Sequence, residues 1–456
     1  MRRPTIRALV GVAAGIAAGV AGGIALTSLS AASPPAPSPP AVLDAAHAPP
    51  VLTLPGEPVT LRYAIVCGPR SDGEACAGGG EVNIRPGQSG PFTRLTLRRG
   101  RDSSLGRYWV EVPGDIAAAP DGFSYYAVLR DRDTGAGTTV PSSGAESPHR
   151  SFRLLRPTEI ALGTHSFGHG RGPDARVVSA GWGSGLGELG LAGSRGLGFV
   201  GPSSFDVGEN GIVTVLDEVN SRVERWSSGR ATGIPIAVSG GLADLAVEPD
   251  GTIDVLEPPN RTTPTSILRS FRTDASLKWA QPLSDRTWSK LEAGPSGPVV
   301  QQQPSEQWLP VSLRGVPLDR ASQRKQATPG RPLAPGRELV VERVGTGEVR
   351  LAEVVGNASV RSWRITSSTP LGEVQLAEPR GNEIVVVTKA YTDEDDEYVV
   401  LVIDGSGLTQ SFSITPSEWA ESAPLARFRL AGSSLYHLGS TPQGAFVDRF
   451  DLEVPR

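Results

Sequence analysis

The chain has 456 residues, of which 38% are hydrophobic and 20% charged, and its net charge is −4 at pH 7. This length exceeds what one hydrophobic core usually organises, so it predicts two folded units. The weakly acidic balance provides no one-signed basic face, which excludes nucleic acid as a partner class. The 55 glycines and 40 prolines show no collagen-like period and indicate many turns between short strands.

Residues 1–32 have the pattern of an export signal. Three arginines precede an apolar run over 8–26, and the small residues Ser30 and Ala32 are typical of a signal-peptidase cleavage site. The run is also long enough to span a bilayer, so a retained signal-anchor with N-terminal membrane anchoring is the alternative. Either interpretation places the rest of the chain outside the cytoplasm.

Residues 33–50 are rich in proline and alanine and predict an extended spacer. Residues 51–155 follow with short alternating stretches separated by glycine, proline and aspartate. This pattern is typical of a β-sandwich. The stretch 123–126 resembles the penultimate strands of fibronectin type III and related immunoglobulin-like modules.

The chain has two cysteines, Cys67 and Cys76. In an oxidising compartment an isolated close pair predicts a disulfide, and two free thiols are the alternative. A zinc site is disfavoured because two thiolates without a nearby histidine leave the metal undercoordinated.

A segment that occurs twice, 40 residues apart, indicates the architecture of the remainder. Residues 201–220 align without a gap onto 241–260. A period near 40 with turn-punctuated strands is typical of β-propeller blades. A strand within 156–162 or 176–180 is expected to close the ring. Blade entries expected near residues 201, 241, 286, 338, 374 and 425 predict a six-bladed propeller over 156–456, with seven blades as the alternative.

The first copy resembles an NHL repeat. It has a glycine-rich entry, an Asn210–Gly211 hairpin and the element Asp217-x-x-Asn220-x-Arg222. One repeat matches well and the later ones are degenerate, so the resemblance implies an NHL-like propeller from about residue 160 onward. We interpret these three polar side chains as structural hydrogen-bonding groups between strands or blades.

The hairpins Asn210–Gly211 and Asp250–Gly251 are interpreted as turns in which both residues have positive φ. Four tryptophans recur at similar blade positions and are predicted to fill the core, with a sugar- or peptide-stacking face as the alternative. They are Trp288, Trp308, Trp363 and Trp419.

Other candidate sites are weaker. His165 and His169 lie in a glycine-rich loop, so a solvated loop is favoured over a metal site. The acidic run 393–397 predicts a solvated hairpin tip, with weak calcium binding as the alternative. His437 is interpreted as a core or edge residue, because no nucleophile elbow accompanies it.

No catalytic set assembles in the sequence, and no cofactor is expected apart from the calcium alternative. The NHL resemblance implies a non-enzymatic extracytoplasmic binding or scaffold protein that presents a propeller face to a protein or glycan. The alternative is a metal-dependent hydrolase, lactonase or lyase with a cation on the central axis. Its candidate ligands are Asp206, Asp244, Asp254 and Glu373.

Overall fold

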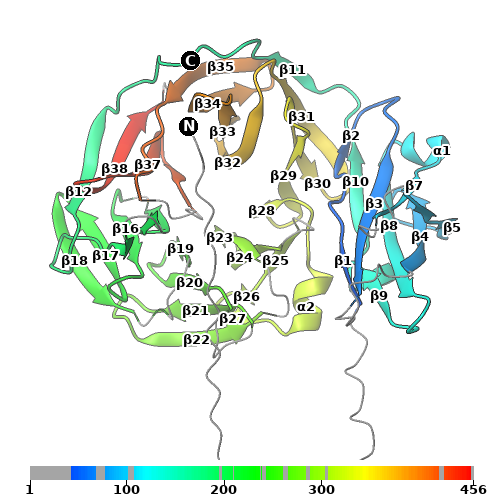
Figure 1. Ribbon diagram of the computed structural model, residues 1–456, viewed down its shortest axis with the longest axis horizontal. Coiled ribbons are helices and arrows are strands. Elements are labelled where there is room, and N and C mark those ends of the chain that lie inside the picture. Colours follow the sequence, from blue (N-terminus) through cyan, green and yellow to red (C-terminus); the bar gives the residue numbers. More distant parts are fainter. Residues whose placement is uncertain are drawn as a thin grey trace, which may run out of the picture. The chain divides into compact units, whose positions relative to one another are not determined.

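The computed structural model describes residues 43–67, 78–100, 107–194, 198–208, 210–236, 238, 243–259, 265–283, 288–302, 307–420 and 426–452. These residues belong to one compact unit, Ala41–Arg456 (Figure 1). The predicted export signal lies outside the described residues, and so do Cys76 and the side chain of Cys67, on which the predicted disulfide depends. Within these ranges, no helix is both long and apolar enough to cross a membrane.

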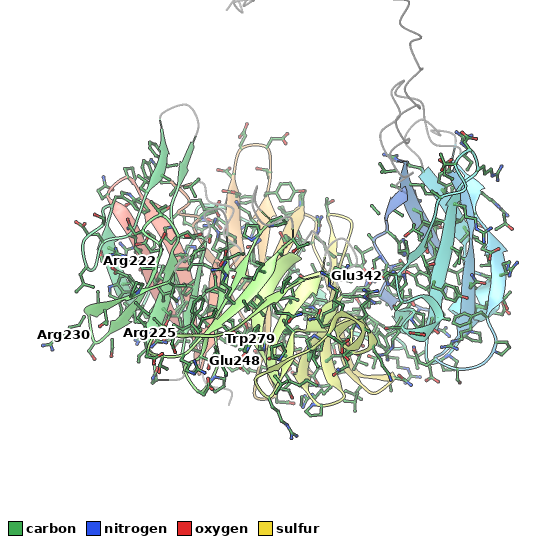
Figure 2. All side chains as sticks on the ribbon, turned by 90° about the horizontal axis from the view of Figure 1, so that it is seen from below. Arg222, Arg225, Arg230, Glu248, Trp279 and Glu342 are labelled. Atoms are coloured by element: carbon green, nitrogen blue, oxygen red, sulfur yellow. The ribbon has the colours of Figure 1, made fainter. Side chains whose placement is uncertain are left out.

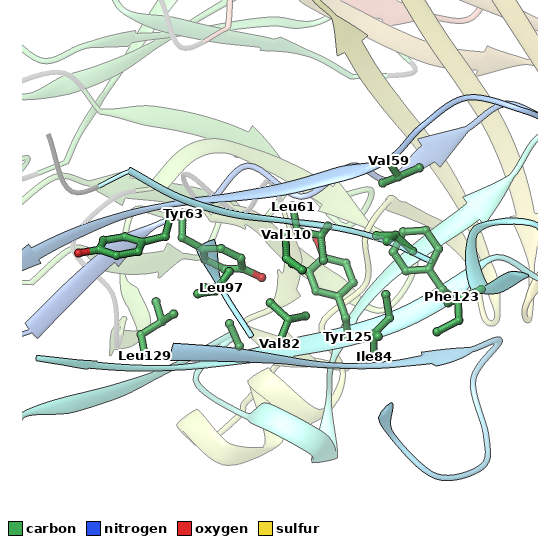
Figure 3. Close-up of a cluster of buried hydrophobic side chains, with 14 of the residues drawn as sticks. Val59, Leu61, Tyr63, Val82, Ile84, Leu97, Val110, Phe123, Tyr125 and Leu129 are labelled. Carbon is green, nitrogen blue, oxygen red and sulfur yellow. The ribbon is translucent and has the colours of Figure 1, made fainter. Parts of the chain in front are cut away.

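The strands up to residue 153 form two sheets. One has the order β1-β3-β7-β6, with bounds Leu43–Ala46, Thr60–Cys67, Arg107–Glu111 and Arg98–Arg99. The other has the order β2-β10-β8-β4-β5, with bounds Leu52–Thr53, His149–Arg153, Phe123–Asp131, Gly78–Pro86 and Thr93–Thr96; β9 (Gly137–Val140) pairs with β8. Alternating side chains of both sheets meet in one buried core that includes Leu61, Tyr63, Val82 and Tyr125 (Figure 3). A short helix, α1 (Gly114–Ala117), and a 3-10 turn, η2 (Gly144–Glu146), connect strands in this region.

Part of the spacer predicted over residues 33–50 forms a strand, β1. β1 pairs antiparallel with β3, and His47 directly after it is 3% exposed. The His47 ring stacks on Tyr63 with 4.2 Å between ring centroids, and its Nδ1 lies 2.6 Å from the carbonyl oxygen of Arg62. A spacer over 43–50 is therefore wrong for these residues, because they include a four-residue strand. The proline and alanine content of the stretch gave no sequence signal for that strand.

The remaining large sheets of the described residues are six in number. Their orders are β15-β16-β17-β18, β19-β20-β21-β22, β23-β24-β25, β28-β29-β30-β31-β11, β32-β33-β34-β35 and β36-β37-β38-β12. Contacts of β15 with β19, β19 with β23, β23 with β28, β29 with β32, β32 with β36 and β36 with β15 close a ring (Figure 1). Such a ring is a β-propeller, so the predicted all-β chain with a propeller is confirmed.

The strands of this ring follow one another along the chain from residue 158 to residue 451. The first half comprises β11 Thr158–Ala161, β12 Ala175–Gly181, β15 Ser204–Val207, β16 Val213–Asp217, β17 Arg222–Ser227, β18 Arg230–Pro235, β19 Asp244–Val247, β20 Ile253–Glu257, β21 Ile267–Phe271, β22 Leu277–Pro282, β23 Trp288–Gly294, β24 Gly297–Gln302 and β25 Trp308–Pro310. The second half comprises β28 Arg331–Ala334, β29 Arg337–Val344, β30 Glu348–Val355, β31 Ala358–Thr366, β32 Leu371–Arg380, β33 Glu383–Tyr391, β34 Asp396–Asp404, β35 Gly407–Ile414, β36 Phe428–Ala431, β37 Ser434–Thr441 and β38 Gly444–Asp451. Smaller elements are the pairs β13 Ala192–Ser194 with β14 Gly198–Val200 and β26 Ser312–Leu313 with β27 Val316–Pro317, and the helix α2 Arg320–Lys325.

The two copies of the 40-residue repeat form neighbouring sheets with the same register. Ser204 pairs with Leu216 in the first copy, and Asp244 pairs with Leu256 in the second. The hairpin interpretation was wrong in one respect, because only the glycines, Gly211 and Gly251, have positive φ. In each hairpin the glycine N–H donates to the carbonyl three residues before it, and the glycine takes the left-handed conformation while the preceding Asn or Asp keeps an ordinary one.

Both candidate strands for closing the ring take part in it. β12 pairs antiparallel with β38 in the last sheet, whereas β11 pairs parallel with β31 two sheets earlier. The segment between them crosses the sheet of β35, where the Arg171 backbone N–H donates to the carbonyl of Ser413. Residues 158–181 therefore connect three sheets of the ring.

Residues 51–57 and 152–154 pack on the sheet of β29 and β30. Leu52 and Phe152 share a buried cluster with Val340 and Val354. Arg350, which is 4% exposed, donates to the carbonyl of Leu52 at 2.7 Å and to both carboxylate oxygens of Glu57. Glu342 of β29 accepts the backbone N–H groups of residues 51 and 52 (Figure 2). Apolar burial and buried ion pairing thus hold these segments together.

Candidate functional site

A buried arginine lies inside the ring. Arg429 belongs to β36, whose neighbours in the ring are β15 and β32. Its guanidinium donates to the carbonyl of Phe205 (β15) at 3.0 Å, the carbonyl of Leu245 (β19) at 2.9 Å and the carboxylate of Glu292 (β23) at 2.7 Å. Because β19 and β23 are not neighbours of β36, the side chain must cross the centre of the ring to reach them.

Two of the predicted metal ligands surround this guanidinium. Asp206 and Asp244 lie 3.8 and 3.9 Å from Arg429. Burial would lower the pKa of Arg429, but Glu292, Asp206 and Asp244 outweigh burial and raise it. The two aspartates also accept backbone N–H groups of the next strand in the ring, from Val247 and Leu291 respectively. Their oxygens therefore already have partners.

The other two predicted metal ligands lie elsewhere. Asp254 is fully buried in β20, a second strand, where burial raises its pKa to about 6. Glu373 is 67% exposed and lies 4.0 Å from Lys290. The described residues contain no group of three or more His, Cys, Asp or Glu side chains that could hold a metal ion. The four candidate carboxylates do not gather at one point, because Asp206 and Asp244 face the guanidinium of Arg429 and the other two lie elsewhere.

A cavity of about 630 Å³ adjoins the carboxylates inside the ring. Strands β23, β28, β29 and β32 form most of its walls, and residues 48–51 with Thr60 and Arg62 of β3 complete them. Apolar side chains alternate with charged ones along these strands, so the lining is mixed. Its apolar members include Trp308, Leu339, Val374 and Phe428, and its charged members include Lys290, Glu292, Arg331, Glu373 and Glu378.

Three strands of the ring bring Arg331, Glu292 and Glu378 together in this cavity. The Arg331 Nη1 atom lies 3.8 Å from Glu292 and 3.7 Å from Glu378. Burial raises the pKa of Glu378 to about 7, although Arg331 opposes this rise. Burial acts in the same direction on Glu292, but Arg429 and Arg331 outweigh it, and the pKa of Glu292 lies below its ordinary value. Glu292 is therefore a carboxylate at neutral pH, whereas Glu378 titrates there.

The pKa of Glu378 predicts a pH-dependent stability. Between pH 4.5 and about 7 the folded protein retains a proton that the unfolded chain has lost, so this contribution to stability is complete below pH 4.5 and is lost as pH rises through 7. Burial is the largest cause of this pKa shift, which Glu292 and Asp206 reinforce and Arg331 and Arg429 oppose. We expect Glu378→Gln to remove a decline on the order of 2–3 kcal/mol between pH 5 and 8, measured by urea unfolding.

Glu373→Gln is the matched control, because Glu373 is on the same strand but largely exposed. It should leave the decline unchanged. A Glu378→Gln profile parallel to that of the unmodified protein would contradict the assignment.

Asp217, Asn220 and Arg222 lie together and bind the glycine-rich segment 183–190. Asp217 accepts the N–H of Gly190 at 2.9 Å, the amide of Asn220 and the Nε–H of Arg222. Arg222 also donates to the carbonyls of residues 184, 185 and 188 (Figure 2). These contacts fix the loop that precedes β15 against β16 and β17, which is a structural task.

One of the candidate histidines, His165, contacts the last residue of the acidic run, Glu397. The His165 Nε2 atom lies 2.9 Å from Glu397, whose other oxygen accepts the N–H of Gly168. Residues 393–396 are exposed, as predicted for a solvated hairpin tip. Glu397, the last residue of the acidic run, is only 3% exposed and does not belong to that tip. His169 is exposed. His437 is buried against Phe428, and burial lowers its pKa to about 3, so it is a core residue.

The tryptophans divide by environment. Trp363 is fully buried and donates its indole N–H to the carbonyl of Asp404, and Trp308 is 8% exposed. Trp419 is half-buried, with Phe199 stacked on it at 4.7 Å between ring centroids. The side chain of Trp288 lies outside the described residues.

Sequence reasoning missed Arg429, Arg331, Glu292 and Glu378. A sequence signal existed for Arg429, which stands between apolar residues in the stretch 428–430. A charge inside a short apolar strand indicates burial with a partner. The partners themselves come from strands about 40 to 220 residues away, so spacing could not reveal them.

No protein-family model and no curated protein matches this chain. Similar solved structures include virginiamycin B lyase from Staphylococcus aureus, at 7% identity and a TM-score of 0.32, covering 55% of this chain and 95% of that one. YCF48 bound to D1 peptide is 11% identical, with a TM-score of 0.32 and coverage of 58% and 82%. The C-terminal WD40 domain of Sif2 is 10% identical, with a TM-score of 0.31 and coverage of 56% and 96%. These values carry no argument about activity, and the propeller assignment rests on the ring of sheets.

Proposed function

We propose that this chain is a non-enzymatic extracytoplasmic binding protein that holds a protein or glycan partner at the cavity between the ring and residues 48–62. The proposal takes the ring as a six-bladed, NHL-like propeller and the two preceding sheets as an immunoglobulin- or fibronectin-III-like sandwich. The export pattern of residues 1–32 supports a place outside the cytoplasm, secreted or anchored by the N-terminal segment.

The cavity carries this proposal. Its volume suits a small ligand or the side chains of a larger one, and it combines apolar walls with a few convergent polar groups. Lys290 donates to the carbonyl of Val374 at 3.0 Å, and Glu292 accepts from Arg429. Charges that are already compensated suit recognition better than nucleophilic chemistry, for which a group must be activated by a neighbouring base.

The metal-dependent hydrolase is less well supported. Asp206 and Asp244 are the predicted ligands that meet inside the ring, and both accept backbone N–H groups next to a guanidinium. A cation there would have to displace Arg429 from a site where it makes three short hydrogen bonds.

The test is a matched pair of tryptophan substitutions. Gln375 is half-buried in the cavity lining, whereas Gln443 is exposed in the hairpin between β37 and β38. We expect arrays of cell-envelope glycans and peptides to identify a partner whose affinity falls at least tenfold with Gln375→Trp and is unchanged with Gln443→Trp. Equal binding by both variants would remove the cavity as the site, and turnover of the bound partner would overturn the non-enzymatic assignment.

A further inference from the structure

Arg331 has hydrogen-bonding capacity that the described residues do not use, and it lies near Glu378 without a short contact to it. Arg331 Nε is buried without a hydrogen-bond partner among those residues. The Arg331 Nη1 atom is 3.7 Å from Glu378 and 3.8 Å from Glu292, which is beyond hydrogen-bond distance. Both side chains line the cavity, with exposed fractions of 15% for Arg331 and 18% for Glu378.

This arrangement differs from the structural ion pair beside it. Arg429 contacts Glu292 at 2.7 Å through one nitrogen and donates through its other two nitrogens to two carbonyls. If Arg331 served only to join β23, β28 and β32, we would expect similarly short contacts, because an unsatisfied buried donor is costly. A ligand that accepts from Arg331 would supply the missing bonds.

The charges around the pair indicate what kind of ligand this is. Glu292, Glu378 and Glu373 would repel an anionic ligand, while Arg331, Lys290 and Arg343 would repel a cationic one. A neutral ligand that both donates and accepts hydrogen bonds meets neither repulsion. Hydroxyl groups have this property, since each offers one donor and two acceptor lone pairs.

The walls of the cavity favour a ring with an apolar face. Trp308 and Leu339 are almost fully buried, yet they line the cavity beside the charged residues. Sugars present hydroxyls at their edges and C–H groups on their faces, so one pyranose satisfies both kinds of lining.

We propose that this part of the cavity is a subsite for a neutral pyranose, whose hydroxyls bind Arg331 and Glu378 while its C–H face packs on Trp308. The inference rests on the proposed binding function and narrows its partner from protein or glycan to glycan. The subsite needs no bond to be made or broken.

Calorimetric titration with defined trisaccharides tests the proposal. The probes are neutral chitotriose, cellotriose, maltotriose and mannotriose, anionic trigalacturonic acid, and the cationic glucosamine trimer. At least one neutral probe should bind at least tenfold more tightly than both charged ones. Glu378→Ala and Arg331→Met should each weaken that binding at least tenfold. Glu378→Gln should stay within threefold, because its amide still donates and accepts.

Arg364→Gln is the control, since Arg364 is on the outer strand β31 and does not line the cavity. Melting temperatures identify variants that fail to fold. If Arg331→Met fails to fold, the comparison of Glu378→Ala with Glu378→Gln decides the outcome. Tighter binding of a charged probe, or neutral binding insensitive to Glu378→Ala, would overturn the subsite. If a peptide bound in the cavity and no sugar did, the sugar subsite would be overturned but the proposed binding function would stand. If nothing bound on either the glycan array or the peptide array, both the subsite and the proposed function would be overturned.

Discussion

Arg429→Met should destabilise the folded protein by about 3–5 kcal/mol. The substitution removes hydrogen bonds to β15, β19 and β23 at once. It also leaves Asp206 and Asp244 buried without their cation and Glu292 with only the more distant Arg331, and uncompensated charge is the larger part of the cost. Urea unfolding, followed by tryptophan fluorescence, measures the change.

Two further variants separate these causes. Arg230→Met removes an arginine that points into solvent from β18 (Figure 2) and should change stability by less than about 0.5 kcal/mol. Adding Glu292→Gln to Arg429→Met should recover part of the lost stability, because one of the carboxylates that faced Arg429 is then replaced by a neutral amide. If Arg429→Met unfolded at the same urea concentration as the unmodified protein, the ring would not depend on this side chain.

Arg350→Ala should have the second largest effect, a loss of about 3–5 kcal/mol at the contact between β30 and residues 51–57. Arg350 is 4% exposed and pairs with Glu57 and Glu348. Burial would lower the pKa of Arg350, but both carboxylates outweigh burial and raise it. Hydrogen exchange should show amides 51–57 opening at least a hundredfold faster, while those of β33 and β34 keep their protection.

Arg364→Ala provides the comparison, because Arg364 also pairs with Glu348, at 2.8 Å, but is 33% exposed. It should leave exchange at 51–57 unchanged. Uniformly faster exchange throughout the ring in Arg350→Ala would show a global role for this residue and contradict the local one.

Much of the ring could be predicted from short-range pattern. The repeat at 201–220 and 241–260 appears as β15-β16 and β19-β20 with identical registers, because strand alternation and hairpin glycines act locally. The entry expected near residue 338 falls on β29, the second strand of its sheet. The first strand there, β28, is four residues long with partly exposed side chains, so alternation could not reveal it. β1 was missed because it too has only four residues and lies in a stretch rich in proline and alanine.

The candidate site could be predicted less well than the ring. The positions of the four carboxylates that were candidate metal ligands show the reason. Asp206 and Asp244 are predicted ligands of a cation inside the ring, and they do face a positive charge there. That charge is the guanidinium of Arg429, which the strand order brings from the far end of the chain. Asp254 lies on the second strand of its sheet, whereas Glu373 lies on a first strand but is largely exposed, so strand position decided against the one and exposure against the other.

The sequence by itself determined that the chain is built of strands and contains a propeller, because two-residue alternation, turn glycines and a 40-residue period are local properties. It also determined that Asp217, Asn220 and Arg222 form one cluster, since all three lie within six residues. Tertiary structure alone decided which carboxylates meet Arg429 and where Arg331 faces Glu378. Those contacts depend on how successive sheets close into a ring, and ring closure joins residues whose separation along the chain no local pattern encodes.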